Sequence, residues 1–186
     1  MKFTIHNVNS APEAAKEILT RSAGAFGFVP NLFGVMAEAP ALLKGYTSLM
    51  RLFEEASLKA AERQVVLLAA SYENECEYCV LAHSAIAAMQ QVPADAVCAI
   101  RDDEAIADPK LEALRRFTAV VVKSQGRPTE EDTKVFLAAG YGKQQILEVV
   151  LGVGLKTLSN YTNHIAETPL DEAFNKAGWS KASGAS

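Results

Sequence analysis

Residues 62–83 of the chain read ERQVVLLAASYENECEYCVLAH, an apolar helical pattern that runs into a Cys-x-x-Cys pair and a histidine. Cys76, Cys79 and His83 follow one another at intervals of three and four residues. On a helix these intervals place the three side chains on one face, because the helix repeats every ~3.6 residues. The stretch therefore predicts a chemical site in which an imidazole lies one turn beyond two thiols.

The start of the predicted dithiol helix favours a reactive thiol. Asn74 is a good N-cap residue, and Glu77 can complete a capping box with it. Cys76 would then lie in the first helical turn, where free N–H groups and the positive end of the helix dipole stabilise an anion. A helix N-terminus, a cationic histidine and a Cys-x-x-Cys motif each lower a thiol pKa from about 8.5 toward roughly 3.5–7.5.

Composition and charge limit the class of protein. With 186 residues, of which 49% are hydrophobic, the chain is long enough for one domain with a substantial core. The formal net charge is −4 and the basic residues are scattered, so we expect neither a nucleic-acid nor a membrane partner. The chain has no long apolar run of the length that spans a membrane and no secretory signal, so we expect a cytoplasmic protein.

The three cysteines are too few for a disulfide framework. In a reducing compartment a Cys-x-x-Cys pair indicates redox or metal chemistry. Cys98 lies in the apolar run Ala96–Ile100, so we expect it to be a buried small hydrophobic residue.

A structural zinc site is the main rival to redox chemistry. Such a site needs four nitrogen or sulfur ligands, and the predicted cluster of Cys76, Cys79 and His83 supplies three. The fourth ligand would have to be one of His6, His164, Cys98 or a water molecule.

Helical signals dominate the chain and strand signals are scarce, so we expect an all-α helical array with short connections. Ser10 is the predicted N-cap of the first helix, which runs toward Gly24. Residues 1–180 should form a single domain, and residues 181–186 a disordered tail. The further helices are expected at 40–53, 60–70, 75–91, 93–100 and 108–126, from the cap residue Thr129 onward, and at 143–164.

The predicted helix from Lys143 to His164 is apolar on nearly every side. A helix of this kind is either central to the core or part of a subunit interface. We expect His164 at its end to interact with the helix dipole, or else to reach the site of a neighbouring subunit.

Three segments together resemble the alkylhydroperoxidase D branch of the carboxymuconolactone decarboxylase-like superfamily. Residues 62–71, running into the Cys-x-x-Cys-x-x-x-His motif, carry most of the likeness. The segments 27–33 (GFVPNLF) and 160–171 (NYTNHIAETPLD) are similar to the peroxidase-related subgroup. The likeness covers the core of the chain, from residue 25 to residue 175.

The resemblance implies a helical domain that forms a homo-oligomer, commonly a trimer or a hexamer. It also implies thiol-dependent reduction of a hydroperoxide without a metal, haem or other cofactor. Cys79 would attack the peroxide, Cys76 would resolve the product as a disulfide, and His83 would relay protons. An external dithiol or lipoyl-type reductant would then restore the two thiols.

The chain departs from the family pattern at Gln64, where the relay of the family uses a glutamate. A glutamine can orient an imidazole, but it does not accept a proton or stabilise imidazolium. Glu62 lies on another side of the helix, whereas the glutamates at 73, 75 and 77 could supply charge from the loop. The alternative function is a non-enzymatic redox sensor or oligomeric scaffold that uses the same dithiol.

Overall fold

The computed structural model describes residues 2–177 and 179–180, and every regular element within them is a helix. The all-α fold class is confirmed. The predicted disordered tail at 181–186 lies outside the described residues. The helices are α1 (Glu13–Phe26), α2 (Asn31–Met36), α3 (Pro40–Glu54), α4 (Ala60–Glu73), α5 (Glu77–Met89), α6 (Ala94–Arg101), α7 (Pro109–Lys123), α8 (Glu130–Ala138), α9 (Lys143–Ala166) and the 3-10 helix η1 (Glu172–Ala177).

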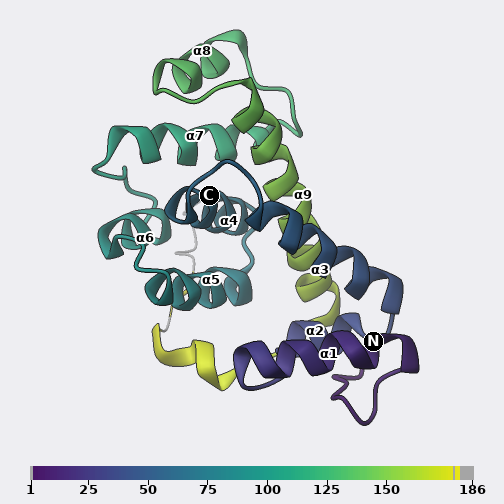
Figure 1. Cartoon of the computed structure of the whole chain (residues 1–186). Coiled ribbons are helices and arrows are strands. Elements are labelled where there is room, and N and C mark those ends of the chain that lie inside the picture. The colour runs from purple at the N-terminus through teal and green to yellow at the C-terminus, as the bar shows by residue number, and fades with distance from the viewer. Residues whose placement is uncertain (1, 178, 181–186) are drawn as a thin grey trace.

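Helix α4 is the central element of the fold (Figure 1), and it packs against α5, α6, α7 and α9. Its residues from Gln64 to Tyr72 are all buried. A helix that is apolar on all sides has to be covered on all sides, which explains the central position. Helix α3 packs along α9, and α1 and α2 pack against α3 at the same end of the molecule.

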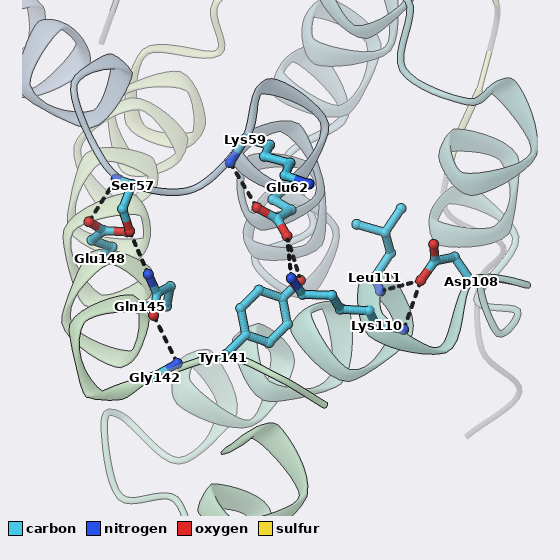
Figure 2. A network of polar contacts seen from close by, with 10 residues as sticks. All are labelled: Ser57, Lys59, Glu62, Asp108, Lys110, Leu111, Tyr141, Gly142, Gln145 and Glu148. Atoms are coloured by element: carbon cyan, nitrogen blue, oxygen red, sulfur yellow. Dashed lines mark hydrogen bonds and ion pairs between the residues drawn. The ribbon is translucent and has the colours of Figure 1, made fainter. Parts of the chain in front are cut away.

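A polar network holds the start of α4 against α7 and α9 (Figure 2). The buried Glu62 carboxylate accepts hydrogen bonds from Lys59 N at 2.8 Å and from Tyr141 OH at 3.2 Å. The Lys110 ammonium group lies 3.4 Å from the same carboxylate and 4.7 Å from the centroid of the Tyr141 ring. Glu62 is therefore occupied in the fold and does not stand in for a carboxylate at position 64.

Helix α9 approaches its neighbours most closely at Gly152. A Cβ atom at this position would lie 2.6 Å from Val66 Cγ1 and 2.9 Å from Phe53 Cζ. Any larger residue would push α9 away from α4 and α3. The glycine therefore sets the depth at which the next turns of α9 reach the middle of the molecule.

Most of the predicted helices are confirmed. Thr129 caps α8 with its side chain, as expected, and Asp108 at the predicted start of α7 caps that helix in the same way. The predicted N-cap at Ser10 is wrong. Helix α1 begins after Pro12 without a side-chain cap, and Ser10 Oγ accepts a hydrogen bond from Asn7 N at 3.0 Å. The short helix α2 has no counterpart among the predicted elements.

The environment of Cys98 also differs from the expectation, because the thiol is exposed rather than buried. Helix α6 buries Val97 and Ala99 on either side of it in sequence. A continuous apolar run on a helix distributes its members around the axis, so one of them faces outward on a helix that is covered on one side only. Cys98 is that member.

The long helix α9 is buried on one face only. Large apolar side chains on its outer face are exposed in the single chain, namely Leu147, Val150, Tyr161 and Ile165. The expected alternatives for this helix are a place in the core and a place in a subunit interface. The inner face of α9 lies in the core, and no described residue covers the exposed side chains of its outer face. In the described part of the chain, no helix combines the length and the hydropathy that a membrane span requires.

Candidate active site

The turn between α4 and α5 positions Cys76, and it differs from the prediction. Asn74 ends α4, and Glu75 adopts a left-handed φ of 57°. Helix α5 therefore begins at Glu77, with Cys76 as its N-cap residue. The predicted Asn74 cap and its capping box are wrong, because Asn74 Nδ2 donates instead to Asn160 Oδ1 on α9 at 2.9 Å.

Both thiols of the Cys-x-x-Cys pair are free and buried. Asn163 Nδ2, from α9, donates to Cys79 Sγ at 3.2 Å and lies 3.7 Å from Cys76 Sγ. Ser159 Oγ, one turn earlier on α9, lies 3.9 Å from Cys79 Sγ. Cys79 is also in the first turn of α5, where the helix dipole favours a negative charge. The surroundings therefore stabilise an anion at Cys79 more than at Cys76.

The two thiols differ in ionisation accordingly. Burial alone raises the pKa of Cys79, but the hydrogen bond with Cys76, the charge of Lys156 and the Asn163 amide outweigh burial and lower this pKa to about 5. The hydrogen bond to Cys79, together with burial, raises the pKa of Cys76 far above its ordinary value. At neutral pH Cys79 is a thiolate and Cys76 is a thiol.

Lys156 provides the positive charge of the site. Its side chain comes from α9, is only 1% exposed and lines the same small cavity as Cys79 and His83. Burial alone lowers the pKa of Lys156, but the negative charge on Cys79 outweighs burial and raises this pKa above its ordinary value. Lys156 is therefore an ammonium ion beside the thiolate.

His83 is oriented by a chain of side-chain amides. Its Nδ1 lies 3.1 Å from Gln64 Oε1, and Gln64 Nε2 donates to Gln90 Oε1 at 3.1 Å. Because the Gln64 oxygen is an acceptor, His83 Nδ1 carries the proton and Nε2 is the free acceptor. Burial and the charge of Lys156 lower the pKa of His83 well below its ordinary value, so the imidazole is neutral at neutral pH.

The cavity at Cys79 is narrow and mostly apolar. Its volume is about 50 Å³, and Cys79, His83 and Lys156 line it together with apolar and aromatic side chains that include Phe26, Phe33, Tyr46, Met50 and Phe174. Three of these residues, Phe26, Phe33 and Met50, also line an open groove of about 460 Å³ between α1 and α3. The groove therefore adjoins the cavity and is a space from which a molecule could approach the sulfur.

The C-terminal segment closes one side of this cavity. Tyr78 OH, between the two cysteines, donates to Asp171 Oδ2 at 2.5 Å. Asp171 also accepts hydrogen bonds from the backbone N of Asn31 at the start of α2. Phe174 of η1 contacts the Tyr78 ring edge-on, with the ring centroids 6.2 Å apart. Asp171 thus connects the dithiol helix, the start of α2 and the C-terminal segment.

The structure brings the four predicted site residues into one place. Cys79 and His83 line the cavity, Gln64 contacts His83, and Cys76 lies behind Cys79. The predicted site does not include the contribution of α9, which consists of Lys156, Ser159, Asn160 and Asn163. Their spacing of three, one and three residues puts them on one helical face, so a polar stripe in an otherwise apolar helix was the available signal.

The zinc alternative depends on a cluster of ligands that the structure does not form. Among the described residues, no three His, Cys, Asp or Glu side chains come together as a possible metal site. His6, one of the candidate fourth ligands, instead lies 2.6 Å from Glu38 Oε2.

Comparison with known proteins identifies the same fold elsewhere. Residues 40–120, from α3 to α7, match the carboxymuconolactone decarboxylase family. A solved structure with an alkylhydroperoxidase D core, an uncharacterised peroxidase-related protein from Ralstonia eutropha JMP134, is 21% identical and superposes with a TM-score of 0.82 over 93% of each chain. No curated protein is recognisably similar in sequence.

Two further structures have the same fold. An uncharacterised peroxidase-related protein from Silicibacter sp. TM1040 is 17% identical, with a TM-score of 0.80 over 95% of this chain and 96% of the other. The debrominase Bmp8, in complex with 2,3,4-tribromopyrrole, is 16% identical, with a TM-score of 0.78 over 94% of each chain. At these identities the likeness establishes the fold. Together with the family match, it confirms the resemblance to the superfamily.

Proposed function

We propose that this chain, a member of the carboxymuconolactone decarboxylase-like superfamily with an alkylhydroperoxidase D-like fold, is a thiol-dependent peroxidase. The observation that carries the proposal is the buried Cys79 thiolate, which faces a small cavity next to a neutral imidazole. A thiolate is the nucleophilic form of cysteine. Cys76, whose thiol stays protonated, is its resolving partner.

The reaction begins with attack of the Cys79 sulfur on the terminal oxygen of a hydroperoxide. The S–O bond forms as the O–O bond breaks, which leaves a sulfenic acid on Cys79 and an alkoxide that takes up one proton. The Cys76 thiol then condenses with the sulfenic acid, giving a disulfide and one water molecule. An external dithiol, or a lipoyl-type reductant, is oxidised as it returns the pair to two thiols.

His83 positions the peroxide in this mechanism. With its proton on Nδ1 and directed to Gln64, its Nε2 is the free acceptor. That atom can accept the hydrogen bond of the peroxide O–H group and hold the terminal oxygen toward the Cys79 sulfur. Gln64 fixes this tautomer without adding a charge, so His83 acts as a positioning group and not as an imidazolium ion.

The size of the cavity supports a hydroperoxide as the substrate more than a brominated ring. A volume of about 50 Å³ accommodates only a few atoms, since one water molecule needs roughly 10–15 Å³ of such space. A terminal –O–OH group fits, while the rest of an organic hydroperoxide would lie in the groove between α1 and α3. A ring that carries several bromine atoms, such as the ligand of Bmp8, does not fit beside Cys79 in this form of the cavity.

A turnover assay tests the proposed function. Purified protein with an organic hydroperoxide and excess small dithiol should consume many equivalents of peroxide, and the variants C79S and C76S should each stop turnover. Because Cys98 is exposed, C98S serves as the matched control and should retain activity. Peptide mapping after alkylation should show a Cys76–Cys79 disulfide.

The alternative functions give different results in the same assay. A redox sensor would form the disulfide once and then stop, even with reductant present. Release of bromide from 2,3,4-tribromopyrrole without consumption of hydroperoxide would replace the peroxidase proposal with dehalogenation.

A further inference from the structure

Lys156 is a buried cation that has no carboxylate partner among the described residues. No described Asp or Glu side chain forms an ion pair with it, although lysines on the surface of the chain pair with Glu13, Glu62 and Glu73. Burying an isolated ammonium ion is costly enough that such a group either has an anion beside it or loses its proton. The anion beside Lys156 is the Cys79 thiolate.

Apart from Cys79, the titratable groups around Lys156 are neutral at neutral pH. Cys79 acts on it most strongly, followed by Tyr46 from α3 and Cys76, and His83 lines the same cavity. Burial raises the pKa of Tyr46, so its phenol keeps its proton. Cys76 stays a thiol and His83 stays an uncharged imidazole. Cys79 is therefore the counter-ion of Lys156, and oxidation of Cys79 removes it.

We propose that Lys156 carries the proton of the redox cycle: it is an ammonium ion while the dithiol is reduced and an amine once Cys79 is oxidised. The part that concerns peroxide rests on the proposed function, while the change of protonation state follows from oxidation of the dithiol by any reagent. Lys156 is then a catalytic residue, because it lies beside the reacting sulfur and hands its proton to the leaving group.

The proton balance of the step supports this role. The Cys79 thiolate, the Lys156 ammonium ion and a neutral hydroperoxide give a sulfenic acid, a neutral amine and an alcohol. The total charge is zero before and after, so the buried cavity never holds an uncompensated charge. When an external dithiol restores both thiols, the Cys79 thiol returns its proton to the Lys156 amine, and the ion pair forms again.

His83 does not take this role in the observed geometry. Its one ring proton, on Nδ1, points to the Gln64 oxygen, and a glutamine amide cannot supply a replacement proton. A general acid has to be protonated where the leaving oxygen develops its charge. Lys156 is the protonated group that lines the cavity with Cys79. In this chain the proton donor is therefore Lys156 on α9, whereas the relay of the family uses a glutamate at the position of Gln64.

The direct test is NMR of isotope-labelled lysine side chains, with the Lys156 signal assigned from K156M. Wild-type protein is titrated with acid and base, once with its dithiol reduced and once after oxidation by diamide, which needs no peroxidase activity. We expect an ammonium signal through neutral pH in the reduced protein and an amine signal at neutral pH in the oxidised protein. Lys156 titrating at the same pH in both forms would overturn the proposal.

Two variants separate the charge of Lys156 from its proton. K156M, which is similar in length and apolar, should shift the pH midpoint of Cys79 alkylation upward and lower kcat/KM for an organic hydroperoxide by roughly 10²-fold or more. K156R keeps the charge but does not release its proton, so it should preserve the low alkylation midpoint and still lose turnover. K134M, at an exposed lysine, is the matched control.

The outcomes distinguish this inference from the proposed function. If wild-type protein shows the redox-dependent change at Lys156 but turns over no peroxide, the proposed function fails and the proton-carrier role stands. If wild-type protein turns over peroxide and K156R is as active as wild type, the proton-carrier role fails and the peroxidase proposal stands.

Discussion

At the scale of single residues, the site depends on how two sulfurs of similar burial come to differ in charge. A negative charge on Cys79 is stabilised by the Asn163 amide, by the charge of Lys156 and by the helix dipole. The Cys76 thiol keeps its proton and donates a hydrogen bond to Cys79. Because the two sulfurs share one proton, the nucleophile and the resolving thiol already differ before a substrate binds. The assignment agrees with the roles that the family resemblance implies.

The pH dependence of alkylation tests this assignment. In a C98S background, which removes the exposed thiol, the rate of iodoacetamide reaction at Cys79 should fall to half near pH 5 and stay constant from pH 7 upward, because the pKa of Cys79 is about 5. The sign follows from the lowered pKa, since protonation below that value removes the thiolate. Peptide mapping identifies the labelled cysteine, and a midpoint near pH 8.5, the ordinary thiol value, would contradict the prediction.

Gln64→Glu should add a second proton donor to the site. A carboxylate 3.1 Å from His83 Nδ1 would raise the pKa of His83 and allow it to donate as imidazolium. A well-placed general acid contributes roughly 10²–10⁴-fold, so even partial restoration should raise turnover measurably. Gln90→Ala is the control, because it removes the neighbouring hydrogen bond without adding a charge. Unchanged turnover in a folded variant would mean that His83 needs no carboxylate here.

At the scale of elements, the site is where the dithiol segment meets the inner face of α9. The glycine at 152 allows α9 to lie against Val66 and Phe53, and the polar residues of α9 follow within the next three turns. The depth of this contact decides whether Lys156 and Asn163 reach the sulfurs. The packing of α9 is therefore part of the catalytic geometry.

Gly152→Ala should loosen this contact. The added Cβ meets Val66 Cγ1 at 2.6 Å, and such overpacking costs roughly 1–3 kcal/mol of unfolding free energy. Gly154→Ala is the matched control, because no atom lies within 4 Å of its Cβ position, and alanine stabilises a helix by about 1 kcal/mol over glycine. Urea denaturation measures both changes. Equal stabilisation by the two substitutions would show that α9 does not depend on a close approach at 152.

The sequence predicts most helices but not the contact between α9 and the turn that leads into α5. The helical periods and the caps at Asp108 and Thr129 depend on local chemistry, so they can be predicted. The start of α5 cannot, because a left-handed residue at Glu75 overrides the better cap residue Asn74, whose amide is bound by α9. Lys156 is missed for the same reason: the partner of a buried charge comes from a distant part of the chain.

At the scale of the whole molecule, the described part of the chain leaves an apolar groove uncovered. The groove has a volume of about 340 Å³ and lies between the start of the chain, α2 and the outer face of α9. Tyr161 and Ile165, which line it, are 54% and 70% exposed. Soluble monomers rarely expose apolar patches above a few hundred Å², so a second copy of this chain is the proposed cover.

Ile165→Glu should therefore dissociate a homo-oligomer. We expect wild-type protein to form a stable closed assembly, a trimer or a hexamer by family resemblance, and the buried carboxylate of the variant to shift it toward monomer because an unpaired charge in an apolar interface is costly. Met89→Glu is the matched control, since Met89 is 82% exposed and lies outside the groove. Light scattering after size exclusion at low micromolar concentration measures the mass of all three proteins. A monomeric wild-type protein would show that the groove is not a subunit interface, and the cysteine site would then have to be complete within one chain.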